Sequence, residues 1–438
     1  MAEFLVVGGG VCGLTLADRL TEAGRSVAVV ERESQPGGLA RTFQYENAAF
    51  DIGPHRFHTT DHQVLDYIDH VLGDDGLIIP RRSLVFFHKH YYNWPIHPTL
   101  NLFKLPLRLI FGVATDLLFF LYRKPKPETF EDYILNMYGK TLYNTFFRDY
   151  TTKFLGIDPA RTHADWAKTG IDRAIIDERL QINTLGELIK SLVVRPKGAE
   201  TKFRYPKGGI ERFAEKLVAQ ITAGGGTVAC NTEVTGLEIR DGRITQVVAG
   251  EKTYRPEQVV WTASLPAVLR LAGEQAPQLD YLDLVCYNLI TKGSYGPDFQ
   301  WCYFGSPDLI FSRVSRPEAF DASLVRTGYG GLCVEVTAGL NPDVWDHPEA
   351  YRDQVVDGLI SVGLLENSKQ IENFQIERVP EAYPMYRIGY DQQLAEAMRQ
   401  IQAIGNLHPA GRTGTFWYNN MDHSIAAAFK LADQLLAK

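Results

Sequence analysis

Residues 4–13, FLVVGGGVCG, join an apolar strand pattern to the spacing G-x-G-x-x-G at Gly8, Gly10 and Gly13. In a βαβ unit the first glycine permits a tight turn and the second lets the backbone approach a pyrophosphate. The third lets the helix pack against its strand. Glu31 closes the next apolar run, where a carboxylate accepts the hydroxyl groups of a ribose. The pattern predicts a dinucleotide site, whereas an isolated motif of this kind is also met in turns that bind nothing.

A second glycine element, G-G-L-A-R-T, follows the strand that carries the acid. Gly37 and Gly38 allow another loop to approach the same cofactor, and Arg41 supplies a cation for a phosphate or a flavin. An NAD enzyme accounts for the first motif, but the pair of glycine elements favours FAD. The arrangement resembles the FAD-binding families that include amine oxidases, protoporphyrinogen oxidase and UDP-galactopyranose mutases.

Composition limits the classes of function. The chain has 438 residues, of which 45% are hydrophobic and 22% charged, which indicates a globular enzyme of two or three domains. A net charge of −7 argues against nucleic-acid binding. The five cysteines are scattered, so we expect no metal site and no disulfide framework. With no cleavable signal before the first strand, we expect a cytoplasmic protein.

Residues 105–122 are strongly apolar, but Arg108 and Asp116 interrupt them, so the segment is not expected to span a membrane. Two interpretations follow. The segment is a buried or subunit-forming helix, with a homodimer as one outcome, or it rests on the cytoplasmic face of a membrane as a peripheral contact.

The periodicity predicts an α/β fold assembled from separated pieces. We expect a discontinuous Rossmann-like FAD-binding domain, similar to that of glutathione reductase, over residues 1–80, 203–265 and 390–438. Residues 99–195 follow a helical pattern and form an inserted helical domain. Residues 81–98 and 266–389 are expected to form an antiparallel β-sheet substrate domain. The segment 211–223 predicts a helix, and another begins near Met421.

Several blocks resemble UDP-galactopyranose mutases in particular. The loop Asp51–Thr59 matches their G-x-H-x-F-H-T loop, which places His55 against the flavin. A hairpin ending near Asn93, a helical Y-T-x-K segment beginning at Tyr150, and the entry to the last helix at Tyr418 also match. The alternative for a histidine-rich loop is an ordinary solvated surface.

Two arginines, Arg313 and Arg412, fall where that family carries arginines that flank the flavin and bind the substrate diphosphate. A strand arginine is otherwise a common solvated ion-pair partner. The resemblance implies catalytic roles for His55, Arg313 and Arg412. It implies the following cofactor contacts: Gly8, Gly10, Gly13, Glu31, Arg32, Gly37, Gly38, Leu39, Arg41, His55, Val234, Gly411, Arg412, Asn420, Met421 and Asp422. It implies the following substrate contacts: Asn93, Tyr150, Leu155, Arg313, Tyr386 and Tyr418.

The chain also departs from that family. Leu155 stands where the family has a tryptophan near the sugar, and Asn420 replaces an aspartate. The block around Tyr386 is closer to protoporphyrinogen and amine oxidases. The resemblance therefore implies FAD, active as FADH2 with NADPH as a candidate reductant, in a mutase of nucleotide sugars. An FAD-dependent oxidase, dehydrogenase or desaturase is the alternative, and a flavin-binding scaffold without turnover is a third class.

Overall fold

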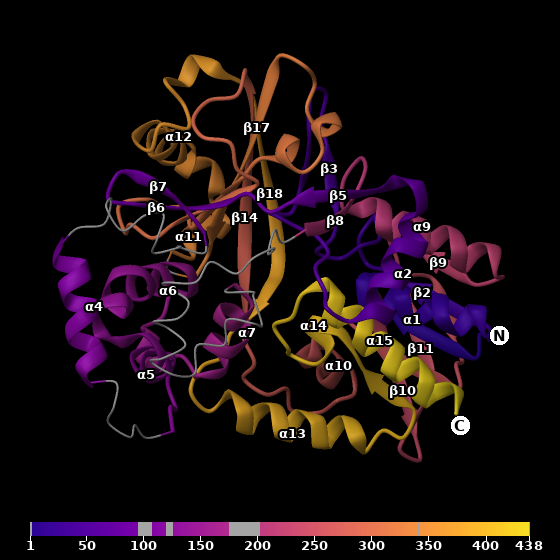
Figure 1. Ribbon diagram of the computed structural model, residues 1–438. Coiled ribbons are helices and arrows are strands. Elements are labelled where there is room, and N and C mark those ends of the chain that lie inside the picture. The colour runs from indigo at the N-terminus through magenta and orange to yellow at the C-terminus, as the bar shows by residue number, and fades with distance from the viewer. Residues whose placement is uncertain (1, 95–106, 120–125, 175–201, 340, 438) are drawn as a thin grey trace.

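The computed structural model describes residues 2–94, 107–119, 126–174, 202–339 and 341–437 (Figure 1). Its first layer is a parallel sheet of five strands in the order β19-β13-β1-β2-β9. All four pairings are parallel, as the predicted Rossmann-like unit requires. The strands are β1 (Phe4–Val7), β2 (Val27–Val30), β9 (Thr227–Ala229), β13 (Gln258–Trp261) and β19 (Leu407–Pro409).

Helix α1 (Val11–Glu22) follows β1 directly and lies beside α15 (Met421–Leu436) and α9 (Glu211–Ala223). The last two helices begin where the sequence predicts. A Cβ atom on Gly13 would lie 2.1 Å from the carbonyl oxygen of Gly8, so only glycine permits this close packing of helix on strand. The helix begins at Val11, and Gly10 in an extended conformation is its N-cap.

The second layer is a mixed sheet of seven strands in the order β18-β14-β17-β16-β15-β6-β7, in which only β15 and β6 pair in parallel. Segments 81–98 and 266–389 contribute all seven, and their role as a substrate domain stays a prediction. They are β6 (Ser83–Phe87), β7 (His90–Asn93), β14 (Tyr281–Lys292), β15 (Trp301–Phe304), β16 (Arg313–Ser315), β17 (Tyr329–Thr337) and β18 (Ile371–Pro384). Helix α12 (Arg352–Ser361) packs on one face through Val355 and Leu359.

Helices gather on the far side of the long strands from α1 and α15 (Figure 1). They are α4 (Leu107–Phe119), α5 (Phe130–Leu142), a π-helical turn (Tyr143–Phe147), α6 (Arg148–Leu155), a 3-10 turn (Pro159–Arg161) and α7 (Asp165–Ala174). Residues 99–106, 120–125 and 175–195 of the predicted helical domain lie outside the described residues.

Helix α4 contains most of the apolar segment 105–122, for which the sequence allows two interpretations. Leu107 is 75% exposed and Phe111 74% exposed, whereas Leu109 is buried. No helix of the described residues is long and apolar enough to cross a membrane. The exposed apolar side chains contradict a fully buried helix, and contact with a second subunit or a membrane surface stays a prediction.

Smaller elements connect these layers. The strands are β3 (Thr42–Gln44), β4 (Ala49–Asp51), β5 (Gly76–Pro80), β8 (Lys202–Pro206), β10 (Val234–Arg240), β11 (Arg243–Ala249) and β12 (Lys252–Tyr254). The helices are α2 (His62–Leu72), α10 (Leu265–Leu271), α11 (Asp343–Asp346), α13 (Tyr390–Gln402) and α14 (Gly411–Gly414). Short 3-10 turns occupy 73–75, 317–319, 322–324, 348–351 and 368–370.

Lys153 of α6 attaches the helical region to the seven-stranded sheet. Its Nζ donates hydrogen bonds to the carbonyl oxygens of Phe304 (2.6 Å), Ser306 (2.8 Å) and Phe311 (2.9 Å). The residue is only 6% exposed, and burial lowers its pKa to about 7. Three acceptors around one buried ammonium make this a specific junction between α6 and the loops at the ends of β15 and β16.

We expect Lys153→Met to lower the free energy of unfolding by about 2–5 kcal/mol, because it leaves three backbone carbonyls without their donor. Urea denaturation followed by tryptophan fluorescence measures the change. Lys168→Met is the matched control, since Lys168 is half exposed and only pairs with Asp165. Equal midpoints for the two variants would show that the junction does not need the ammonium.

Candidate active site

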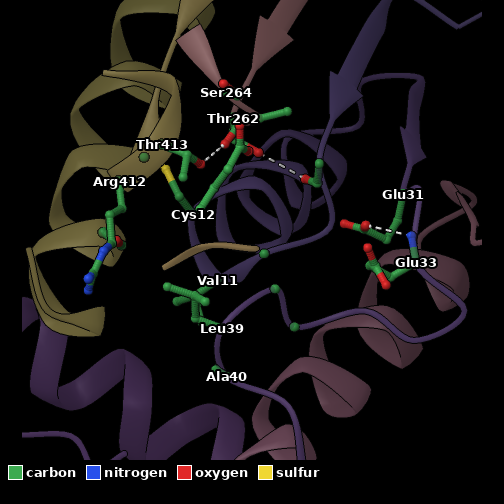
Figure 2. Close-up of a pocket in the computed structure, with 18 of the residues that line it drawn as sticks. Val11, Cys12, Glu31, Glu33, Leu39, Ala40, Thr262, Ser264, Arg412 and Thr413 are labelled. Carbon is green, nitrogen blue, oxygen red and sulfur yellow. Dashed lines mark hydrogen bonds between the residues drawn. The ribbon is translucent and has the colours of Figure 1, made fainter. Parts of the chain in front are cut away.

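A cavity of about 480 Å³ runs along the carboxyl ends of β1 and β2 (Figure 2). The two glycine loops predicted to share a cofactor meet in its wall. The Gly37 N–H donates to the carbonyl oxygen of Gly9 at 2.7 Å. A Cβ atom on Gly38 would lie 3.2 Å from the Cα atom of Gly10. A side chain at Gly38 would therefore push the two glycine loops apart.

Glu31 holds the first glycine loop in place. Its Oε2 accepts a hydrogen bond from the Gly9 N–H (2.6 Å), and its Oε1 accepts one from the Glu33 N–H (2.9 Å). Both Glu31 and Glu33 line the cavity in Figure 2. A carboxylate oxygen has a second lone pair, so contact with a ribose stays a prediction beside this structural role.

Gly13 packs against β1 and does not line the cavity, but the remaining residues predicted at this end do. They are Arg32, Leu39, Arg41 and Val234. The Nε of Arg41 donates to the carbonyl oxygen of Gly38 at 2.8 Å, which stabilises the second glycine loop. Arg32 is more exposed and pairs with Glu33.

Arg412 lies at the other end of the cavity, directly after Gly411. Its guanidinium lies over the rings of Tyr383 (4.7 Å) and Tyr418 (4.6 Å), which are inclined to each other by 77°. It donates to the carbonyl oxygens of Asn419 (3.1 Å) and Ala382 (2.6 Å), and its buried Nε has no partner. Burial lowers its pKa. No carboxylate of the described residues pairs with it, so this cation is held mainly by aromatic rings and carbonyls.

The N-terminus of α15 faces the same end. Asn420 is the N-cap, and Asn420, Met421 and Asp422 line the cavity, where their contact with a cofactor stays a prediction. The neighbouring Asn419 is buried, and its Nδ2 has no hydrogen-bond partner. A helix N-terminus and an unpartnered amide donor together favour a ligand with negative charge or carbonyl oxygens.

His55 lines the same cavity as Arg412 and the strand arginine Arg313. Burial lowers its pKa to about 3, with further lowering by Arg313, Arg412 and Arg56. Its Nδ1 is buried without a partner. The imidazole is therefore neutral at physiological pH and has one ring nitrogen available to a ligand.

Arg313 forms an ion pair within the seven-stranded sheet. Its Nε and Nη2 donate to the two oxygens of Glu335 on β17, each at 2.5 Å, and Nη2 also donates to the Tyr383 hydroxyl (3.2 Å). Glu335 is 2% exposed. Sequence reasoning missed this partner, although an acid within the apolar run Cys333–Val336 is a signal for a buried counterion.

A second cavity, of about 690 Å³, lies between the helical region and the seven-stranded sheet. Tyr150 lines it and stacks on Phe154 at 5.9 Å. Trp166, another lining residue that the sequence did not reveal, stacks on Tyr418 at 4.9 Å. Arg313, Tyr383 and Tyr418 line both cavities, so the two spaces adjoin at this shared wall.

Three residues predicted to contact the substrate line neither cavity. Leu155 is buried in the core, and Asn93 ends β7 at the surface. Tyr386 is also buried, and its hydroxyl oxygen accepts a hydrogen bond from the backbone N–H of Tyr418 at 2.8 Å. Tyr386 therefore positions Tyr418 rather than reaching the cavity itself.

Residues 11–294 match the model of the flavin-containing amine oxidoreductases, which is about two thirds of the chain. The chain belongs to this family. A probable UDP-galactopyranose mutase of Klebsiella pneumoniae is 22% identical over 99% of this chain and 95% of its own length. Reduced UDP-galactopyranose mutase superposes with a TM-score of 0.84 at 19% identity, over 100% of this chain and 94% of its own. A putative protoporphyrinogen oxidase from Exiguobacterium gives 0.78 at 16% identity, over 99% of both chains.

The first cavity of this flavoprotein fits the family's cofactor. Gly10 and Gly38 leave room for a pyrophosphate, and the cavity extends from Glu31 to Arg412, as an elongated dinucleotide requires. The buried atoms without partners at the far end, on Arg412, Asn419 and His55, are those that the polar edge of a flavin would satisfy.

We expect Gly10→Val to abolish flavin binding, because its branched side chain occupies the approach of the pyrophosphate to the backbone. Absorbance near 450 nm after reconstitution with FAD measures the retained cofactor. Gly236→Val is the control, since a Cβ there meets only the Val248 side chain, at 3.7 Å. A Gly10→Val protein as yellow as wild type would contradict this assignment of the cavity.

Proposed function

We propose that the protein is a flavin-dependent mutase that isomerises the ring of a nucleotide-linked sugar without net oxidation or reduction. The observation that carries the proposal is the shared wall of the two cavities. At this wall Arg313, Tyr383 and Tyr418 separate the site that fits a flavin from an aromatic cavity of about 690 Å³. The similarity to a probable UDP-galactopyranose mutase over nearly the full length of both chains supports the same chemistry.

A bound, reduced flavin supplies a nucleophilic ring nitrogen, so the protein itself needs no serine or cysteine nucleophile. The chain's part is to bind and orient. Arg412 attracts the diphosphate of the substrate to the shared wall, and Arg313 presents a guanidinium edge fixed by Glu335. Tyr150 offers an aromatic surface to the base, and neutral His55 hydrogen-bonds without adding charge.

Arg313 and Arg412 make different electrostatic contributions. The charge of Arg313 is balanced by Glu335, whereas Arg412 has no carboxylate partner among the described residues. An anionic ligand therefore gains more from Arg412. Removal of Arg313 also leaves a buried carboxylate alone, which is a cost to the protein and not only to the ligand.

We expect Arg412→Gln to weaken UDP binding by about 2–5 kcal/mol, since it removes a desolvated cation from an anion site. Isothermal titration of the flavin-loaded protein measures the affinity. Arg212→Gln is the control, because Arg212 is half exposed and pairs with Glu215 on α9. If Arg412→Gln and wild type bind UDP equally, the arginine belongs to the cofactor site alone.

Turnover distinguishes the mutase from an oxidoreductase. We expect protein reduced with dithionite or NADPH to convert a nucleotide sugar into its ring isomer anaerobically, with the flavin still reduced afterwards. Chromatography of a panel of UDP- and dTDP-sugars detects the isomer, and absorbance follows the flavin. Oxidised protein is the control and should be inactive.

The similarity of fold to a putative protoporphyrinogen oxidase, together with the aromatic lining of the second cavity, favours an FAD-dependent oxidoreductase as the second candidate. In that case oxidised protein consumes an apolar substrate and produces peroxide or a reduced acceptor, while no ring isomer forms. This result would replace the mutase proposal.

A further inference from the structure

Arg56 is a buried cation in the loop that carries His55. Its guanidinium lies over the rings of Trp301 (4.7 Å) and Phe203 (5.4 Å), and the residue lines the first cavity. Nη1 donates to the carbonyl oxygen of Pro54 at 3.3 Å, and the buried Nε has no partner. The planar guanidinium of Arg56 thus lies over two aromatic rings, and most of its N–H donors make no hydrogen bond within the described residues.

The surroundings of Arg56 are rich in positive charge. Arg81 stacks on the same indole at 5.5 Å, and burial, followed by the charge of Arg56, lowers the pKa of Arg81 to about 10. Burial also lowers the pKa of Arg56 itself, and the charge of Arg313 lowers it further. His58 faces both Arg56 and Arg81, and its pKa is lowered chiefly by burial.

The nearby carboxylates do not balance this charge. Glu335 is bound by Arg313, and the Oδ1 of Asp422 lies 3.2 Å from Nδ1 of His423. Asp422 acts on Arg56 only as a weaker, more distant charge. Within the described part of the chain, no carboxylate oxygen lies within 4.0 Å of the Arg56 guanidinium. A desolvated cation of this kind calls for an anion from outside the chain.

We propose that Arg56 binds an oxyanion of the substrate, either a phosphate or a sugar carboxylate, as a third cation beside Arg313 and Arg412. The inference rests on the proposed function. Trp301, over which Arg56 lies, is two residues before Tyr303 on β15 and so shares its face of the strand, and Tyr303 lines the second cavity. The N-terminus of α15 and Asn419 line only the first cavity, at the end that fits a flavin.

The test measures binding of four probes to flavin-loaded wild type, Arg56→Gln and Arg56→Lys by isothermal titration. The probes are inorganic pyrophosphate, UDP, UDP-galactose and UDP-galacturonate. We expect Arg56→Gln to lower the affinity of the protein for at least one probe by about 30-fold or more. Arg56→Lys keeps the positive charge but loses the planar guanidinium, so it should also lower the affinity for the same probe. Arg212→Gln should match wild type.

The pattern across the probes identifies the oxyanion. A loss for all four assigns Arg56 to the phosphates, and a loss confined to UDP-galacturonate assigns it to a sugar carboxylate. Pyrophosphate binding that depends on Arg56, without binding of any nucleotide sugar, would contradict the proposed function and support this inference. The inference about Arg56 would be overturned if both variants bound every probe with an affinity within threefold of wild type. A wild-type protein that binds none of the four would overturn it as well.

Discussion

The ion pair between Arg313 and Glu335 organises the centre of this molecule. It joins adjacent strands β16 and β17, and it extends to β18 through the Tyr383 hydroxyl. The carboxylate of Glu335 also lies against the histidine-rich loop, because a Cβ on Gly53 would be 2.7 Å from its Oε1. Gly53 has a φ of +68°, which glycine adopts without strain. One buried pair therefore sets the position of the strands, of His55 and of the shared cavity wall.

Around that pair, the chain keeps cations buried by stacking them on aromatic rings. Arg412 lies over Tyr383 and Tyr418, and Arg56 lies over Trp301 and Phe203. A ring face attracts a guanidinium without cancelling its charge, whereas a carboxylate such as Glu335 cancels it. The site can therefore present positive charge to a ligand from a desolvated wall, where each interaction is stronger than in water. The chain as a whole remains acidic, with a net charge of −7.

Sequence reasoning was most successful where local geometry imposes residue type. The spacing of Gly8, Gly10 and Gly13 fixed a strand, a turn and a helix, and the structure confirms the meeting of the two glycine loops. It was least successful where strand register and helix docking decide contacts. Glu335, Trp166 and the stacked Arg56 lie near the site because distant segments pack there, which no local pattern encodes. The same reason accounts for Leu155, which packs in the core and lines neither cavity.

The difference between the two predicted arginines has a consequence for how such a site evolves specificity. Replacement of Arg313 leaves the buried carboxylate of Glu335 without its counterion, so Arg313 is needed for the stability of the fold. Arg412 and Arg56 are held by carbonyls and ring faces, which tolerate replacement at smaller structural cost. Substitution of Arg412 or Arg56 can therefore adapt the site to ligands of different charge. Substrate preference within this fold should therefore depend on the ring-stacked cations and on the aromatic lining, while the buried ion pair maintains the wall on which they act.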